Sequence, residues 1–167
     1  MPHPALGLPP ADATAGHPDI AARLLAAADR LPALALQAAL RRDPGLADRH
    51  DELALRRFLR DYDRHLEQLA RAVATGEARF VTVYAETLVP TYRRRHVRMN
   101  DVVTLIRGLE EVAVASGSTV DADAIRRPVD AWVERLRRHR RLPGDHTGNA
   151  IARFFFKGAG LGDDTII

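Results

Sequence analysis

The chain contains no cysteine, which excludes disulfide bonds, thiolate metal sites and a cysteine nucleophile. The absence fits a reducing compartment, and we expect a cytoplasmic protein. Lysine is almost missing too, because 24 of the 25 basic residues are arginines and Lys157 is the one lysine. Such a composition is typical of a GC-rich genome, so the arginine content is not by itself a functional signal.

Long apolar runs are missing as well. No stretch approaches the roughly 18 consecutive apolar residues of a membrane-spanning helix, so we predict no membrane segment. Residues 1–17 lack a basic region followed by an apolar core, so they do not resemble a secretory signal, and their prolines and glycines favour a flexible leader. Hydrophobic residues make up 46% and charged residues 28% of the chain, which is typical of a globular domain.

Motifs for catalysis, metal binding and nucleotide binding are lacking. The sequence has no HExxH, Glu-x-x-His or GxSxG motif. Asp61 and His65 share a helical face, but Glu67 points elsewhere, so we interpret the first two as a solvated pair. The glycine-rich run 158–162 has neither the spacing nor the following helix of a phosphate-binding loop. We therefore predict that the protein is not an enzyme and has no metal ion or cofactor.

Three histidines in or near the predicted helices are candidates for an axial haem ligand. His65 borders a polar face, His96 follows three arginines, and His139 lies in an arginine run. A proximal histidine needs apolar surroundings, which none of these positions offers. Binding of haem or of another small ligand therefore stays an alternative function, behind the hypotheses given below.

Helical periodicity begins at Pro18, where apolar residues start to recur at three- and four-residue spacing. The clearest apolar stripe runs through residues 48–75 and consists of Leu55, Phe58, Leu59, Tyr62, Leu66, Leu69, Ala70 and Val73. The predicted helices cover residues 18–31, 32–42, 48–75, 77–88, 100–112 and 121–139. We expect Gly76 to cap the third of these, Pro90 to interrupt the fourth or start another turn after it, and Asn100 or Asp101 to cap the fifth.

This pattern predicts an all-α domain of five or six helices, packed as a bundle or in a globin-like arrangement. The expected organisation is a flexible leader (1–17), a helical domain (18–141) and an aromatic, glycine-rich C-terminal tail (142–167).

Positive charge is concentrated in the second half of the chain. Residues 1–90 have a net charge of −1, whereas residues 91–167 have a net charge of +4. Two arginine clusters account for the excess: Arg93, Arg94, Arg95 and Arg98, and Arg137, Arg138, Arg140 and Arg141. These side chains can pair with acidic neighbours and complement helix ends. They can also contact phosphates, so an RNA- or ribosome-binding protein is the alternative function.

The tail carries three adjacent phenylalanines, which cannot all face one side of a helix. At least one aromatic ring is then exposed unless something covers it, and exposed clustered aromatic rings usually mark an interface. We expect the tail either to close the helical domain or to bind a partner. The candidate partner-binding residues are Phe154, Phe155, Phe156, Lys157 and Leu161.

Two segments of the helical domain, LRRFLRDYDRHLEQLARAVATG and LVPTYRRRHVRMNDVVTLIRGLEEV, resemble the N-terminal sensor domain of stressosome RsbT co-antagonist proteins. The resemblance implies a non-haem globin-like helical fold and a dimeric, non-catalytic sensor module in stress signalling. It carries over no ligand residues. That family usually adds a C-terminal STAS output domain, and we expect the aromatic tail to take its place here. We therefore expect a homodimeric sensor or adaptor that acts through protein–protein interaction, with the tail as its docking or dimer-closing element.

Overall fold

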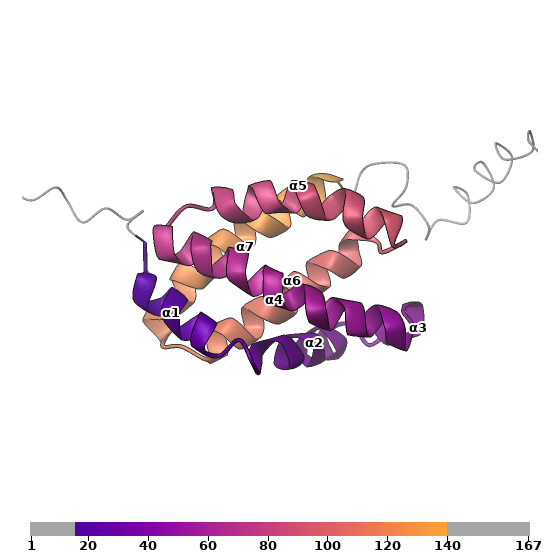
Figure 1. Cartoon of the computed structure of the whole chain (residues 1–167), viewed down its shortest axis with the longest axis horizontal. Helices are drawn as coiled ribbons and strands as arrows, with labels where there is room; N and C mark the ends of the chain where they lie inside the picture. Colours follow the sequence, from indigo (N-terminus) through magenta and orange to yellow (C-terminus); the bar gives the residue numbers. More distant parts are fainter. Residues whose placement is uncertain (1–15, 140–167) are drawn as a thin grey trace, which may run out of the picture.

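The computed structural model describes residues 16–139, and all regular secondary structure in this range is helical. The elements are α1 (Pro18–Ala26), α2 (Leu31–Arg42), α3 (Gly45–Arg49), α4 (Glu52–Thr75), α5 (Arg79–Arg94), α6 (Met99–Ala115) and α7 (Thr119–His139) (Figure 1). The predicted all-α bundle is confirmed. The described residues form seven helices instead of five or six, because the five-residue α3 is too short for a periodic signal.

The long helix α4 organises the bundle. It packs against α1 and α2 on one side and against α5 and α7 on the other, while α6 packs mainly against α2 and α7 (Figure 1). Its apolar stripe is buried through Phe58, Tyr62, Leu66, Leu69 and Val73. Because helices pack on two sides of α4, its buried face is wider than a single apolar stripe.

The ends of α4 follow from local chemistry. The carboxylate of Asp51 accepts a hydrogen bond from the backbone N–H of Ala54 at 2.8 Å, which satisfies one free donor of the first turn. At the other end Gly76 has φ 70°, the left-handed conformation that glycine adopts without steric cost. The predicted glycine cap is therefore confirmed.

Two predicted boundaries are wrong. Helix α5 continues through Pro90 to Arg94. Proline removes one backbone hydrogen bond, but the helix is held by buried residues before and after it, such as Val89 and Tyr92. Helix α6 begins at Met99, and the carbonyl of Arg98 accepts the first helical hydrogen bonds, from Asp101 and Val102. Asp101 is therefore a buried residue inside the first turn and not an N-cap.

Between residues 16 and 139, no helix is both long enough and apolar enough to cross a bilayer.

Candidate functional site

His65 lies at the centre of a buried aromatic cluster. His65 is only 1% exposed, so the prediction of a solvated Asp61–His65 pair is wrong. The position follows Tyr62 by three residues, and residues three apart share a helix face. Because α5 and α7 both cover this side of α4, the flank of its apolar stripe is buried with the stripe itself.

A chain of hydrogen bonds runs through His65. Its Nδ1 lies 3.0 Å from the hydroxyl of Tyr84, and its Nε2 lies 3.1 Å from the hydroxyl of Tyr92. The Tyr92 hydroxyl donates to Oδ2 of Asp61 at 3.0 Å, and Arg95 donates to the same oxygen at 2.7 Å. These five side chains, which come from α4, α5 and the residue after α5, are called the His65 network below.

The direction of these hydrogen bonds is fixed at the Asp61 end. A carboxylate can only accept, so Tyr92 gives its single hydroxyl proton to Asp61. Nε2 of His65 must then carry a proton and donate it to the oxygen of Tyr92. That leaves Nδ1 as an acceptor, which receives the hydroxyl proton of Tyr84. The oxygen of Tyr84 can then accept a further hydrogen bond, but it has no second proton to give.

Burial keeps the network neutral apart from its ion pair. Burial, assisted by the charge of Arg95, lowers the pKa of His65 to about 3. Burial and the charge of Asp61 raise the pKa of Tyr92, and the same two causes raise the pKa of Tyr84. At neutral pH the imidazole is therefore uncharged and both tyrosines keep their hydroxyl protons.

The three histidines named as haem candidates have other surroundings in the structure. Both ring nitrogens of His65 face tyrosine hydroxyls. His96 is an exposed turn residue with φ 58°, and Nε2 of His139 lies 3.1 Å from Glu86. In the described part of the chain, no group of three or more His, Asp or Glu side chains is placed to hold a metal ion.

Helix α7 contacts the network through Trp132, which is fully buried. The indole packs edge-on against His65, with ring centroids 5.5 Å apart, and against Tyr84, with centroids 5.6 Å apart. Edge-to-face packing of this kind depends on ring orientation. A movement of the Tyr84 ring therefore acts directly on α7.

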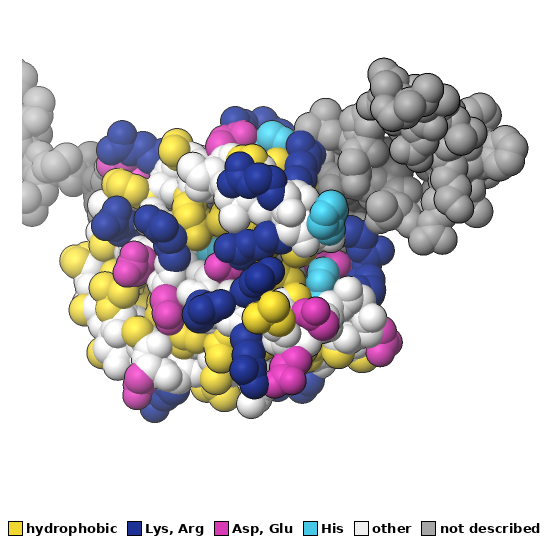
Figure 2. Space-filling model, turned by 45° about the vertical axis from the view of Figure 1, so that its right-hand side comes forward, with side chains coloured by type: hydrophobic (Ala, Val, Ile, Leu, Met, Phe, Trp, Pro, Cys, Tyr) yellow, Lys and Arg dark blue, Asp and Glu magenta, His cyan; other side chains and the backbone are white. Residues whose placement is uncertain are grey.

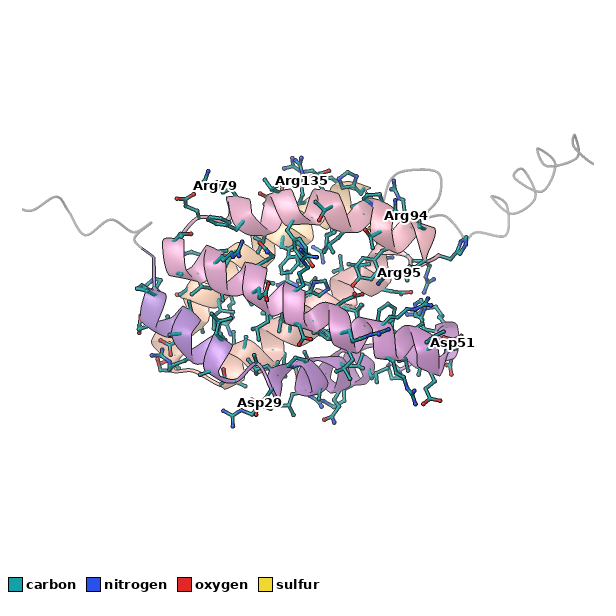
Figure 3. All side chains as sticks on the ribbon, viewed as in Figure 1. Asp29, Asp51, Arg79, Arg94, Arg95 and Arg135 are labelled. Carbon is teal, nitrogen blue, oxygen red and sulfur yellow. The ribbon has the colours of Figure 1, made fainter. Side chains whose placement is uncertain are left out.

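A groove of about 750 Å³ opens between α4 and α5 beside the network. The groove extends along α5, whose two ends are marked by Arg79 and Arg95 in Figure 3. Its lining residues are Asp61, Arg64, Gln68, Arg79, Phe80, Val83, Tyr84, Thr87, Leu88, Thr91 and Arg95. Three of these, Asp61, Tyr84 and Arg95, also belong to the His65 network. A molecule in the α4–α5 groove would therefore contact residues that are bonded to the core.

A smaller groove of about 350 Å³ lies between α5 and α7. Its polar groups are already paired, because Glu86 binds both Arg135 and His139. Hydrogen bonds from His139 and Arg135 lower the pKa of Glu86. This ion cluster joins the C-terminal half of α7 to α5, and we interpret it as structural.

The structure brings parts of the two predicted arginine clusters together. Arg93 donates to the backbone carbonyl of His139 at 2.9 Å, so the C-terminal ends of α5 and α7 are adjacent. Several of these arginines have partners: Arg95 pairs with Asp61, Arg98 with Asp101, and Arg138 with Glu134. Figure 2 shows basic side chains mixed with acidic ones on this side of the molecule.

Two of the candidate arginines, Arg94 and Arg137, are exposed and have no ion-pair partner between residues 16 and 139. The remaining candidates lie outside the described residues: Arg140, Arg141, Phe154, Phe155, Phe156, Lys157 and Leu161.

Sequence reasoning missed a second buried polar group, Asp101. Its carboxylate accepts hydrogen bonds from Arg49 at 2.9 Å and from Arg98 at 3.2 Å, and lies 2.9 Å from Nε2 of His50. Burial raises the pKa of Asp101, but these hydrogen bonds outweigh burial and lower the pKa overall. The cluster joins α3 and the segment before α4 to α6. The sequence did offer a signal for this cluster: Asp101 lies in the first turn of a helix, and that helix directly follows an arginine-rich segment.

Comparison with known proteins adds no family. A scan against protein-family models finds no match, and a search of curated proteins finds no significant one. The resemblance to the stressosome sensor domain, and with it the globin-like arrangement, stays a prediction.

Proposed function

We propose that the chain is a non-catalytic sensor or adaptor module that receives a small ligand in the α4–α5 groove. One observation carries this proposal: Asp61, Tyr84 and Arg95 line the groove and also belong to the buried His65 network. A surface site that shares its residues with the core can report its occupancy to the rest of the fold.

Helix α7 is the element that would respond. Tyr84 holds His65 by a hydrogen bond and touches Trp132 through its ring, so a ligand that displaces Tyr84 changes two contacts at once. The C-terminal end of α7 is tied to α5 by Arg93 and by the Glu86 cluster. Loosening or tightening of α5 against α7 would be the signal passed to a partner.

The partner belongs to the same proposal. The protein would act as a homodimer in the cytoplasm. The tail residues Phe154, Phe155 and Phe156 would close the dimer or dock to another protein, in agreement with the clustered aromatic residues of the sequence. Replacing the three phenylalanines with alanine should remove dimerisation or partner binding and leave the helical circular dichroism intact. Unchanged mass by light scattering together with unchanged partner binding would contradict the role of the tail.

The absence of cysteine allows a direct test of the groove. A Thr87→Cys variant has one thiol, located in the α4–α5 groove, which N-cyclohexylmaleimide can modify to fill the space. We expect the modification to change amide hydrogen exchange in α7, measured by mass spectrometry, and the emission of Trp132, the one tryptophan of the chain.

Thr104→Cys is the matched control. Thr104 and Thr87 each donate a hydroxyl hydrogen bond to a carbonyl of their own helix, but Thr104 is on α6 and outside the groove. Its modification should leave α7 unchanged. If the modified Thr87→Cys protein also shows unchanged exchange in α7, the groove is not a sensing site and the proposed function fails.

A second candidate function rests on the Arg93–His139 contact, which brings Arg93 and Arg94 close to the C-terminal end of α7, where Arg137 and Arg138 lie. An RNA- or ribosome-binding surface there would use Arg94 and Arg137, whose guanidinium groups are exposed. It predicts an RNA gel shift that weakens steeply with salt and is reduced in the Arg94→Gln/Arg137→Gln variant. An absent shift at low salt would eliminate this candidate.

A further inference from the structure

We propose that the ligand of the α4–α5 groove is an amphipathic organic anion, with a carboxylate head and a hydrocarbon body. This inference rests on the proposed sensor function, because it names the class of molecule that the same groove receives.

The groove is lined by more positive than negative side chains. Three arginines and one acid line the groove, and two of the arginines are already paired: Arg95 with Asp61, and Arg79 with Glu77. Arg64, one turn beyond Asp61 on α4, has no hydrogen-bond or ion-pair partner within residues 16–139. Its charge acts on the Tyr84 hydroxyl, as does that of Glu67, which forms no ion pair with Arg64. The groove therefore offers one guanidinium for a ligand near its middle.

The apolar surface lies along α5. Phe80, Val83 and Leu88 of α5 all line the groove, and Phe80 and Val83, three residues apart, lie toward the same side of the helix. Val83 is 65% exposed, the highest value among the exposed large apolar side chains between residues 16 and 139. From Phe80 to Arg95 the wall extends about 22 Å along the helix axis. A hydrocarbon chain several carbons long can lie on this surface with its head at Arg64.

The charges beside the His65 network disfavour a cationic head group and leave Arg64 as the donor for an anion. Tyr84 donates its only proton inward to His65, so its oxygen offers an anion no second donor. Asp61 is neutralised by Arg95 and accepts from Tyr92, so it gives a cation little attraction. Arg64 would repel a cation and would attract a carboxylate by a charge-assisted hydrogen bond. The favoured head is therefore an anion bound to Arg64.

The test compares three probes with the same eight-carbon body. Octanoate, octan-1-ol and octylammonium are titrated into the full chain at pH 7.5 by isothermal calorimetry, below the concentrations at which they aggregate. We expect octanoate to bind about 10-fold more tightly than octan-1-ol, which corresponds to one good charge-assisted contact. Octylammonium should bind more weakly than either.

Two variants assign the effect to the groove. Arg64→Gln should reduce octanoate binding to the level of octan-1-ol. Arg126→Gln, which removes an exposed arginine of α7 outside both grooves, should not change it. Modification of Thr87→Cys with N-cyclohexylmaleimide should block octanoate, because the modifying group fills the same space.

The outcomes separate this inference from the proposed function. Equal affinity for the three probes, blocked by modification of Thr87→Cys, would overturn the anionic class but keep a ligand-binding groove. Octanoate that still binds after that modification would lie elsewhere, and the inference would be wrong. No binding of octanoate would also overturn it, while the response of α7 to the modified Thr87→Cys protein would still decide the sensor function.

Discussion

Asp101 and His65 are both about 1% exposed, yet the bundle stabilises them in opposite ways. Asp101 keeps its charge and is surrounded by Arg49, Arg98 and His50. His65 remains uncharged and is hydrogen-bonded to two tyrosine hydroxyls. A buried charge needs oppositely charged partners, whereas a buried neutral ring needs only a donor and an acceptor.

The two clusters also end differently. The carboxylate of Asp101 is enclosed by side chains of α3, of the segment before α4 and of the residue before α6, so the cluster acts as a fastening. The His65 network ends at Tyr84, Asp61 and Arg95, which line the α4–α5 groove. The comparison indicates where to look for function, because a network that reaches an open surface can respond to what binds there.

Replacing Asp101 with alanine should lower the free energy of unfolding by about 3 kcal/mol, because it leaves Arg98 without its anion and Arg49 with Asp43 alone. Urea unfolding followed by circular dichroism at pH 7.5 measures the loss. Glu111→Ala is the control, since Glu111 also bridges two arginines, Arg41 and Arg42, but is 42% exposed, and its removal should cost less than about 1 kcal/mol. Equal losses in the two variants would refute the fastening role of Asp101.

The pH dependence of stability should separate the two clusters. The folded pKa of His65 is about 3, below the value of 6.5 for a free histidine, so between these values the unfolded chain binds a proton that the folded chain does not. Stability from this residue is therefore complete above pH 6.5 and falls by about 1.4 kcal/mol per pH unit below it, or about 2 kcal/mol at pH 5. Asp101, whose pKa is lowered from 3.8, loses its contribution only when the pH falls below that value.

His65→Gln isolates the histidine term, because glutamine keeps a donor and an acceptor but does not titrate. The difference in unfolding free energy between wild type and variant should shrink as the pH falls from 7 to 5. A difference that stays constant over this range would show that His65 titrates alike in the folded and the unfolded chain, as an exposed histidine does.

The helices could be predicted from the sequence because their apolar spacing is a local property. Pro32, Gly76 and the stripe of α4 correctly marked where helices begin, end and face the core. Pro90 misled because the cost of an internal proline is small compared with the packing of the whole of α5.

The polar core could not be predicted in this way. Tyr84, Tyr92 and Trp132 are 19, 27 and 67 residues from His65 in sequence, and only the packing of α5 and α7 on α4 brings them to it. Asp101 likewise depends on Arg49 and His50, about 50 residues before it. The periodicity of a single helix carries no information on partners at such separations. The groove between α4 and α5 was missed for the same reason.

Removing the Tyr92 hydroxyl should have an intermediate effect. In Tyr92→Phe the proton on Nε2 of His65 loses its acceptor and Asp61 loses one donor, and both groups are at least partly buried. The expected loss is about 1.5 kcal/mol by urea unfolding. Tyr62→Phe is the comparison, since Tyr62 donates to the carbonyl of Leu105 outside the network. In a double variant with His65→Gln, the Tyr92 effect should fall and the Tyr62 effect should add independently.

Removing the Tyr84 hydroxyl should have the smallest effect on stability, below about 1 kcal/mol, because Tyr84 is half-buried and water from the groove can donate to Nδ1 of His65 in its place. The effect on coupling should be large, since the direct bond between the groove and His65 is gone. In the Tyr84→Phe/Thr87→Cys protein, modification of the thiol should alter hydrogen exchange in α7 far less than in Thr87→Cys alone. A stable variant with undiminished coupling would show that the ring contact with Trp132, and not the hydroxyl, transmits the signal.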